Sequence, residues 1–345
     1  MTTRVLICDD SSLARKQMAR ALPPGPAYRI LFASNGAEAL ATLRAQPVDL
    51  MFLDLNMPEV SGYQVLEHTQ AEGLAVLTIV VSGDIQPEAQ KRVRNLGAIG
   101  FIKKPIELGA VLALLAEYGF YRPGELENAA LNDDLLDPGD ADDFPEIPIS
   151  LNDYLQEVAN IAMGRASDLL ARLLHVFVKQ PIPRVSLIAN SELNMALSAV
   201  NNGHTYSAVC QGFTGAGIAG EALLLFADAN FGQMAKLLQY ESAEGESANV
   251  EVLMDLSSIL FGAFLKGLGD QLGLQLGPSH PTVLGQHQPV TELLENRSAR
   301  REQLLCIEIS YNLEERGVQC DMLLLLTEDS MPFLEQRLHD LMDKP

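Results

Sequence analysis

Residues 50–58 read Leu-Met-Phe-Leu-Asp-Leu-Asn-Met-Pro, an apolar run that ends in an aspartate and is soon followed by a proline. Four consecutive apolar residues are typical of a parallel strand that helices cover on both faces. Similar runs recur in the first 120 residues, separated by amphipathic stretches that fit helices. The predicted strands are 5–8, 30–33, 50–53, 76–81 and 99–102. Five strand–helix units predict a doubly wound α/β domain with a five-stranded parallel sheet, which binds ligands at its carboxyl edge.

Polar side chains stand where these strands end. Asp9 and Asp10 follow the first strand, Asp54 the third, Ser82 the fourth and Lys104 the fifth. Three carboxylates at one sheet edge repel one another unless a divalent cation neutralises them, and oxygen ligands alone suit Mg²⁺. Asp54 can then act as a nucleophile toward a phosphoryl donor, while Lys104 and Ser82 stabilise the phosphoryl oxygens.

These residues, with Asp-Leu-Asn-Met-Pro at 54–58 and Lys-Pro at 104–105, resemble a two-component response-regulator receiver domain of the CheY type over residues 3–121. The resemblance implies that Asp54 is the phosphoacceptor and that a sensor histidine kinase is the cognate partner. It also implies that Phe101 is an aromatic switch residue coupled to Ser82. The implied magnesium ligands are Asp10, Asp9 acting mostly through water, Asp54 and the backbone carbonyl of Asn56.

Charge and composition divide the chain and limit the classes of function. The net charge is −21, and 48% of the residues are hydrophobic. Residues 1–122 carry 12 acidic and 12 basic side chains, residues 123–149 carry 9 and none, and residues 150–345 carry 24 and 12. We predict a first domain at 1–122, an acidic flexible linker at 123–149 and a second domain at 150–345. So acidic a surface disfavours nucleic acid as a partner.

The apolar runs and cysteines predict no membrane span, secretory leader, zinc site or disulfide framework. The longest apolar runs fall far short of the roughly 20 residues that cross a bilayer, and the four cysteines show no C-x-x-C pairing. We therefore expect a cytoplasmic protein.

The second domain repeats itself with a period near 100 residues, which predicts an α+β domain of two halves, 150–247 and 248–345, related by a pseudo-two-fold axis. Asp153, Glu157 and Asn160 follow one another at helical spacings of four and three, so their side chains share a helix face. A carboxamide there can hold a water in line with phosphorus while the carboxylate grips a nearby cation.

This region resembles the CheC/CheX/FliY family of chemotaxis-type phosphatases, with Asp153, Gly164 and Pro183 as supporting motif residues. The resemblance implies an aspartyl-phosphate phosphatase in which Asn160 orients the attacking water and Glu157 binds a receiver lysine. The second half has Asp255 and Ser258 at the corresponding positions, and a hydroxyl lacks the donor–acceptor pair of an amide. We therefore predict that the second site is degenerate.

Two readings of function follow from these resemblances. In the first, the chain is a response regulator whose output domain hydrolyses aspartyl phosphate on its own Asp54, on a second copy in a homodimer, or on a separate CheY-like receiver. Phosphorylation either activates or inhibits that output. In the second, the chain is a non-enzymatic adaptor, and phosphorylation controls how its degenerate CheC-like domain docks a signalling partner.

Overall fold

The computed structural model divides into two compact units, Met1–Glu157 and Val158–Pro345. The structure describes residues 2–23, 28–121, 149–189, 205–240, 246–289, 293, 303–314 and 316–342. The predicted acidic linker, apart from its last residue, lies outside the described residues.

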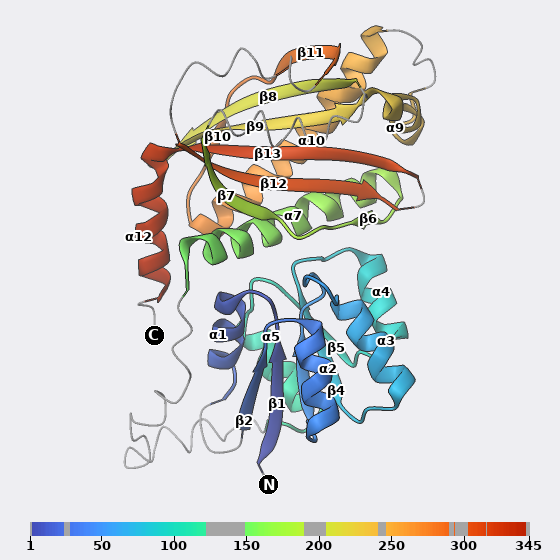
Figure 1. Ribbon diagram of the computed structural model, residues 1–345, viewed down its shortest axis with the longest axis vertical. Helices are drawn as coiled ribbons and strands as arrows, with labels where there is room; N and C mark the ends of the chain where they lie inside the picture. Colours follow the sequence, from blue (N-terminus) through green and yellow to red (C-terminus); the bar gives the residue numbers. More distant parts are fainter. Residues whose placement is uncertain are drawn as a thin grey trace. The chain divides into compact units, whose positions relative to one another are not determined.

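The first unit contains a five-stranded parallel sheet in the order β2-β1-β3-β4-β5. Its strands are β1 (Thr3–Cys8), β2 (Tyr28–Ala33), β3 (Leu50–Leu53), β4 (Leu77–Ser82) and β5 (Gly100–Lys103). The helices between and after them are α1 (Ser12–Arg20), α2 (Gly36–Ala45), α3 (Gly62–Glu72), α4 (Pro87–Asn95) and α5 (Leu108–Glu117). Helices α1 to α5 surround the sheet (Figure 1). The predicted five-stranded parallel α/β domain is confirmed.

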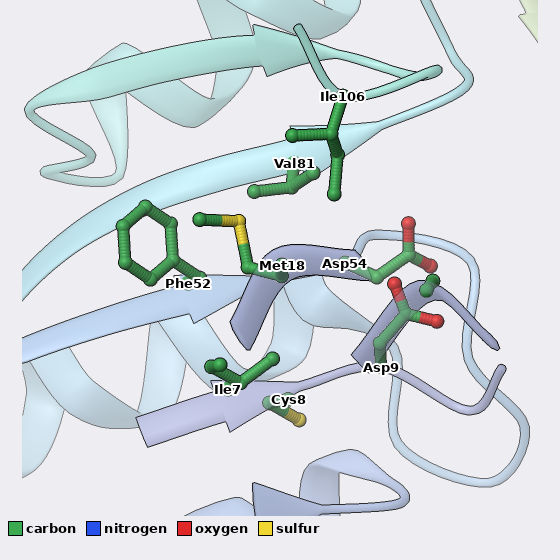
Figure 2. Close-up of a pocket in the computed structure, with 9 residues that line it drawn as sticks. Ile7, Cys8, Asp9, Met18, Phe52, Asp54, Val81 and Ile106 are labelled. Atoms are coloured by element: carbon green, nitrogen blue, oxygen red, sulfur yellow. The ribbon is translucent and has the colours of Figure 1, made fainter. Parts of the chain in front are cut away.

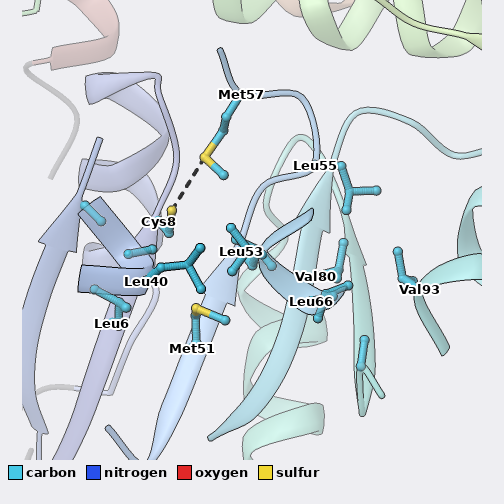
Figure 3. Close-up of a cluster of buried hydrophobic side chains, with 14 of the residues drawn as sticks. Leu6, Cys8, Leu40, Met51, Leu53, Leu55, Met57, Leu66, Val80 and Val93 are labelled. Atoms are coloured by element: carbon cyan, nitrogen blue, oxygen red, sulfur yellow. Dashed lines mark hydrogen bonds between the residues drawn. The ribbon is translucent and has the colours of Figure 1, made fainter. Parts of the chain in front are cut away.

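Alternate residues of β3 enter two separate cores, one on each face of the sheet. Met51 and Leu53 belong to the cluster drawn in Figure 3, whereas Leu50 and Phe52 pack into the cluster on the other face. All four side chains are at most 1% exposed. Burial on both faces explains why apolar and polar residues do not alternate in the sequence of this strand.

Local contacts fix the loops that carry the polar residues at the sheet edge. Ser11 caps α1, because its Oγ accepts a hydrogen bond from Ala14 N at 3.1 Å. Gly62, at the start of α3, packs against the loop after β3, and a Cβ there would lie 2.1 Å from the carbonyl oxygen of Asp54. The close approach of α3 to Asp54 therefore requires glycine at position 62.

The second unit is built on an antiparallel sheet, and its elements recur in the same order. The helix α7 begins in the first unit and continues into the second. The first series is α7 (Leu151–Leu174), β6 (Val178–Lys179), β7 (Arg184–Ala189), β8 (Tyr206–Gly215), β9 (Ile218–Ala227), η2 (Asp228–Asn230) and α9 (Phe231–Leu237). The second is α10 (Glu246–Leu272), β10 (Gly277–Pro278), β11 (Thr282–Gln288), β12 (Gln303–Leu313), β13 (Val318–Thr327), η3 (Glu328–Ser330) and α12 (Met331–Met342).

Strand pairing joins the two series into one sheet, in the order β10-β8-β9-β13-β12-β6. The central pair is β9 with β13, in which Leu223 lies opposite Leu323. The short strand β10 of the second series pairs with β8 of the first, and β6 of the first pairs with β12 of the second. Each series therefore supplies a strand to the other's edge. The structure confirms that the second unit combines an antiparallel sheet with helices. The predicted CheC-like pseudo-two-fold axis between its halves stays a prediction.

The apolar helix α10 is a core element of this unit. Ser247–Leu272 is long and apolar enough to cross a membrane, and among the described residues it is the one helix that is. However, 61% of its most apolar stretch is buried inside the unit, as expected of a helix in a protein core. Gly267 lets α10 approach α7, since a Cβ there would lie 2.9 Å from Ala162 Cα.

Candidate phosphorylation site

The structure gathers the predicted carboxylates at the carboxyl edge of the parallel sheet. Asp9 and Asp10 follow β1 and Asp54 follows β3, and one oxygen from each lies within 4.8 Å of the others. Figure 2 shows the Asp9 and Asp54 carboxylates side by side at one end of a small cavity of about 10 Å³, whose other lining side chains are apolar. Both residues are buried, at 4% and 1% exposure. Two of the three acidic groups are thus buried beside an apolar cavity, and Asp10 is partly buried next to them.

Lys104 supplies positive charge to this cluster. Its Nζ lies 2.8 Å from Asp9 Oδ2 and 3.2 Å from Asp54 Oδ1, and its side chain is 2% exposed. Burial lowers the pKa of Lys104, but the charges of Asp54, Asp9 and Glu157 more than offset this and hold it well above its usual range. The lysine therefore stays protonated and can pair with an added anionic group.

The acidic residues carry more negative charge than Lys104 can balance. Burial raises the pKa of Asp10 to about 7, and the neighbouring charge of Asp54 adds to the shift. Burial likewise raises the pKa of Asp9 well above its usual range, against the opposing effect of Lys104. These raised pKa values show that the cluster, without a further cation, favours holding protons.

The donor set fits a divalent cation such as Mg²⁺. Asp54 Oδ2 accepts a hydrogen bond from Asn56 N at 2.7 Å, which fixes the carboxylate. Asp54 Oδ1 is fully buried and accepts no hydrogen bond among the described residues, although Lys104 Nζ lies within ion-pair distance. A buried carboxylate oxygen beside two further carboxylates suits a hard cation. Asp9, Asp10 and Asp54 would hold it, and the predicted role of the Asn56 carbonyl stays a prediction.

Ser82 and Phe101, the predicted phosphate-binding and switch residues, lie on neighbouring strands. Ser82 ends β4, is fully buried, and accepts a hydrogen bond from Asp84 N at 3.1 Å through its Oγ. Phe101 lies on β5 and packs, partly buried, against the cluster of Figure 3. Sequence reasoning missed Asp84, which is 2% exposed and accepts hydrogen bonds from the backbone and side chain of Gln86. The predicted coupling of Ser82 to Phe101 stays a prediction.

The first turns of α7, residues 151–157, complete the site of the first unit. Glu157, the last residue of that unit, places Oε1 3.1 Å from Lys104 Nζ and is 4% exposed. Gln156 Nε2 donates to Asp10 Oδ2 at 3.3 Å, and Ser12 Oγ donates to Asp153 Oδ2 at 3.4 Å. Sequence reasoning singled out Glu157 and Asp153 and missed Gln156, whose amide gave no motif.

The remaining predicted residues lie in the second unit. Asn160, Gly164 and Pro183 are buried, the first two on α7 and the third in the segment just before β7. The two residues of the degenerate site are exposed on α10 and make local contacts. Asp255 Oδ2 accepts from Tyr240 Oη at 2.6 Å, and Ser258 Oγ donates to the Met254 carbonyl at 2.8 Å.

Comparison with known families identifies the first domain. Residues 5–116 match the family model described as "Response regulator receiver domain". Together with the parallel sheet and the acidic cluster, this match establishes a CheY-like receiver domain at the N-terminus. A receiver domain implies a phosphodonor such as a sensor histidine kinase.

Individual relatives share this domain within longer proteins. A protein-glutamate methylesterase/protein-glutamine glutaminase of Rhodospirillum rubrum is 36% identical over 104 residues, which is 30% of this chain and 28% of the relative. A Vibrio cholerae protein named "Probable cyclic di-GMP phosphodiesterase" is 34% identical over 110 residues, which is 30% of this chain and 24% of the relative. Among solved structures, chemotaxis protein CheY4 of V. cholerae matches with 24% identity and a TM-score of 0.32, covering 34% of this chain and 98% of CheY4.

These findings correct the predicted enzymatic activity. The chain spans about a third or less of the length of the curated relatives named above. Their names record methylesterase, glutaminase and phosphodiesterase activities, and none is an aspartyl-phosphate phosphatase. The prediction that the chain is such a phosphatase is therefore wrong. The spacing of Glu157 and Asn160 misled it, because two polar residues on one helix face do not by themselves specify a reaction.

Proposed function

We propose that the chain is a response regulator in which phosphorylation of Asp54 controls a non-enzymatic docking domain. The observation that carries this proposal is the ion pair between Lys104 and Glu157. The same ammonium that a phosphoryl group on Asp54 needs already holds the first turns of α7. Phosphorylation and α7 therefore compete for one buried cation.

The competition follows from charge and distance. Lys104 Nζ lies about equally far from Asp54 Oδ1, at 3.2 Å, and from Glu157 Oε1, at 3.1 Å. A phosphoryl group on Asp54 brings further negative charge and strong acceptor oxygens to Lys104. Glu157 then loses part of its counter-charge and faces a like charge while almost fully buried. A buried charge without a partner is costly, so phosphorylation favours a state in which Glu157 leaves Lys104.

Magnesium would act on a second contact of α7. When bound, Mg²⁺ supplies positive charge that offsets the phosphoryl oxygens and the carboxylates around them. Asp10, one of the residues that would hold it, accepts a hydrogen bond from Gln156. A cation on Asp10 would draw the carboxylate away from this amide. Both contacts of α7 with charged groups of the site therefore weaken when the site is loaded.

We further propose that the second unit is a degenerate CheC-like domain that acts by binding a partner. The repeated order of its elements and the mutual strand exchange support a two-fold relation between the halves. Its second polar pair, Asp255 and Ser258, is engaged by contacts with Tyr240 and Met254, which fits a binding surface better than a hydrolytic site. The acidic charge of residues 150–345 favours a protein partner over a nucleic acid.

Hydrogen exchange in the intact chain tests the switch. With Mg²⁺ and beryllofluoride, a phosphoryl mimic that binds the phosphoacceptor aspartate, we expect amides of residues 151–157 to exchange several-fold faster than with Mg²⁺ alone. The control Asp54→Ala should show no change. Unchanged or slower exchange in the wild-type chain at saturating mimic would overturn the proposed switch.

The lifetime of the Asp54 phosphate tests the non-enzymatic part separately. Chains loaded with acetyl phosphate are freed of donor, and release of inorganic phosphate is followed over time. We expect Asn160→Ala and wild type to lose phosphate at the same rate. A phosphate lifetime several-fold longer in Asn160→Ala would refute the non-enzymatic docking proposal. The hydrogen-exchange result on the switch would not be affected.

A further inference from the structure

Arg15 is a buried cation beside the acidic cluster that makes no ion pair with a carboxylate among the described residues. It lies on α1, five residues after Asp10, and is 9% exposed. Its Nη1 donates to the carbonyl oxygen of Asp9 at 2.6 Å and to that of Asp10 at 3.2 Å. Placing a guanidinium at low exposure is costly, so this contact calls for an explanation.

The contact spares the carboxylates for other partners. A guanidinium next to acidic side chains normally forms a two-pronged ion pair with one of them. Here it binds main-chain carbonyls, while the Asp9 carboxylate is oriented separately by a hydrogen bond from Ser11 N at 2.9 Å. The backbone of Asp9 and Asp10 is thus held from one side, and the side chains remain directed toward Asp54.

We propose that Arg15 is a positioning residue for the phosphorylation reaction, which fixes the Asp9–Asp10 backbone so that both carboxylates converge with Asp54 on one divalent cation. The two carbonyls belong to consecutive residues just after β1, where the chain leaves the sheet after a last hydrogen bond from Asp9 N to the Ala33 carbonyl at 3.2 Å. Arg15 lies near the start of α1 and links this segment to that helix, whose N-terminus is capped by Ser11. The inference rests on the receiver domain alone and is independent of the docking function.

Positioning and simple electrostatics predict opposite results. Arg15 is a positive charge close to a cation site, so its removal would tighten Mg²⁺ binding if charge were its only effect. If Arg15 acts by orienting the ligands, its removal weakens binding despite the lost repulsion. Outer partners that orient metal ligands change metal affinity by about 10- to 100-fold when removed. The sign of the change therefore distinguishes the two roles.

The test uses the full chain, with Mg²⁺ as the probe and titration calorimetry as the readout. We expect Arg15→Gln to weaken Mg²⁺ binding by about 10-fold or more. Arg15→Lys keeps the charge, but its single ammonium lacks the fixed planar geometry that places Nη1 against both carbonyls, so an intermediate loss of about 3-fold is expected. The matched control Lys16→Gln removes one positive charge from the neighbouring position of α1 and should leave the affinity unchanged.

Two further readouts separate positioning from a general loss of structure. In the absence of Mg²⁺, amides of residues 10–12 should exchange faster in Arg15→Gln, while those of β3 and β4 keep their protection. With acetyl phosphate, the Mg²⁺ concentration for half-maximal phosphorylation should rise, and the rate at saturating Mg²⁺ should fall less than 3-fold. If Arg15→Gln fails to fold, Arg15→Lys decides the question. Wild-type or tighter Mg²⁺ affinity in the folded variant tested overturns the proposal.

Discussion

Replacing Glu157 by glutamine should make the phosphorylation site bind its anionic ligand more tightly. The change removes a charge 3.1 Å from Lys104 Nζ and keeps the size of the side chain. At an effective dielectric constant near 20, two unit charges at this distance attract by about 5 kcal/mol. Most of this gross term offsets the cost of burying both groups, as is usual for buried pairs. We take a net effect of about 1 to 2 kcal/mol, equivalent to about 5- to 30-fold in affinity.

The assay is calorimetric titration of beryllofluoride into the intact chain at saturating Mg²⁺. Glu157→Gln should bind 5- to 30-fold more tightly than wild type, because Lys104 no longer has to exchange one anionic partner for another. The matched control Glu117→Gln removes one negative charge at the exposed end of α5 and should bind as wild type does. If Glu157→Gln bound no more tightly than Glu117→Gln, competition for Lys104 would not be the basis of the switch.

Three further predictions concern the stability of each unit, measured by urea unfolding. Gly62→Ala places a Cβ 2.1 Å from the Asp54 carbonyl oxygen and should lower the free energy of unfolding by about 2 to 4 kcal/mol. The control Gly109→Ala lies in α5 with open space around it and should be neutral or slightly stabilising, so equal effects of the two changes would contradict the packing argument. Burial raises the pKa of Asp10 in the folded chain to about 7, against a usual value of 3.8. Mg²⁺-free wild type should therefore lose stability relative to Asp10→Asn as pH rises from 4 through 7, by up to about 4 kcal/mol, and a constant difference would refute this. The Tyr311 hydroxyl is fully buried and has no hydrogen-bond partner among the described residues. Tyr311→Phe should therefore raise the free energy of unfolding by about 1 kcal/mol, and a decrease of that size would contradict the missing partner.

The receiver domain could be predicted from sequence because its strands are buried on both faces. Leu50–Leu53 reads as an uninterrupted apolar run for this reason, and each such run marks a strand with little ambiguity. Once the strands are parallel, topology alone brings their carboxyl ends to one edge. Asp9, Asp54 and Lys104 were therefore found together without knowledge of any distance.

Other features of the site leave no such pattern. Arg15 lies on an amphipathic helix, where a basic residue reads as a solvated surface group. Its function depends on two backbone carbonyls, and main-chain geometry has no signature in side-chain order. Gln156 was missed because a single amide beside a predicted motif residue looks ordinary. In the second unit the repeat was visible, but the exchange of β6 and β10 between the halves was not, because a period does not say which edges pair.

Charge balance explains why Glu157, among the groups that share Lys104, is the one expected to leave. Asp9 lies 2.8 Å from the ammonium, and Asp54 carries the phosphoryl group itself, so both keep a cation nearby when Mg²⁺ is bound. Glu157 has no such second cation within ion-pair distance among the described residues. Its neighbour Gln156 donates to Asp10, which would hold the metal, so this contact would weaken as well. Loading the site thus adds negative charge that competes with Glu157 for Lys104, and water can solvate a departing carboxylate at little cost. The asymmetry is built into the positions of these acids along the chain, two of them on the sheet edge and one on the helix that follows.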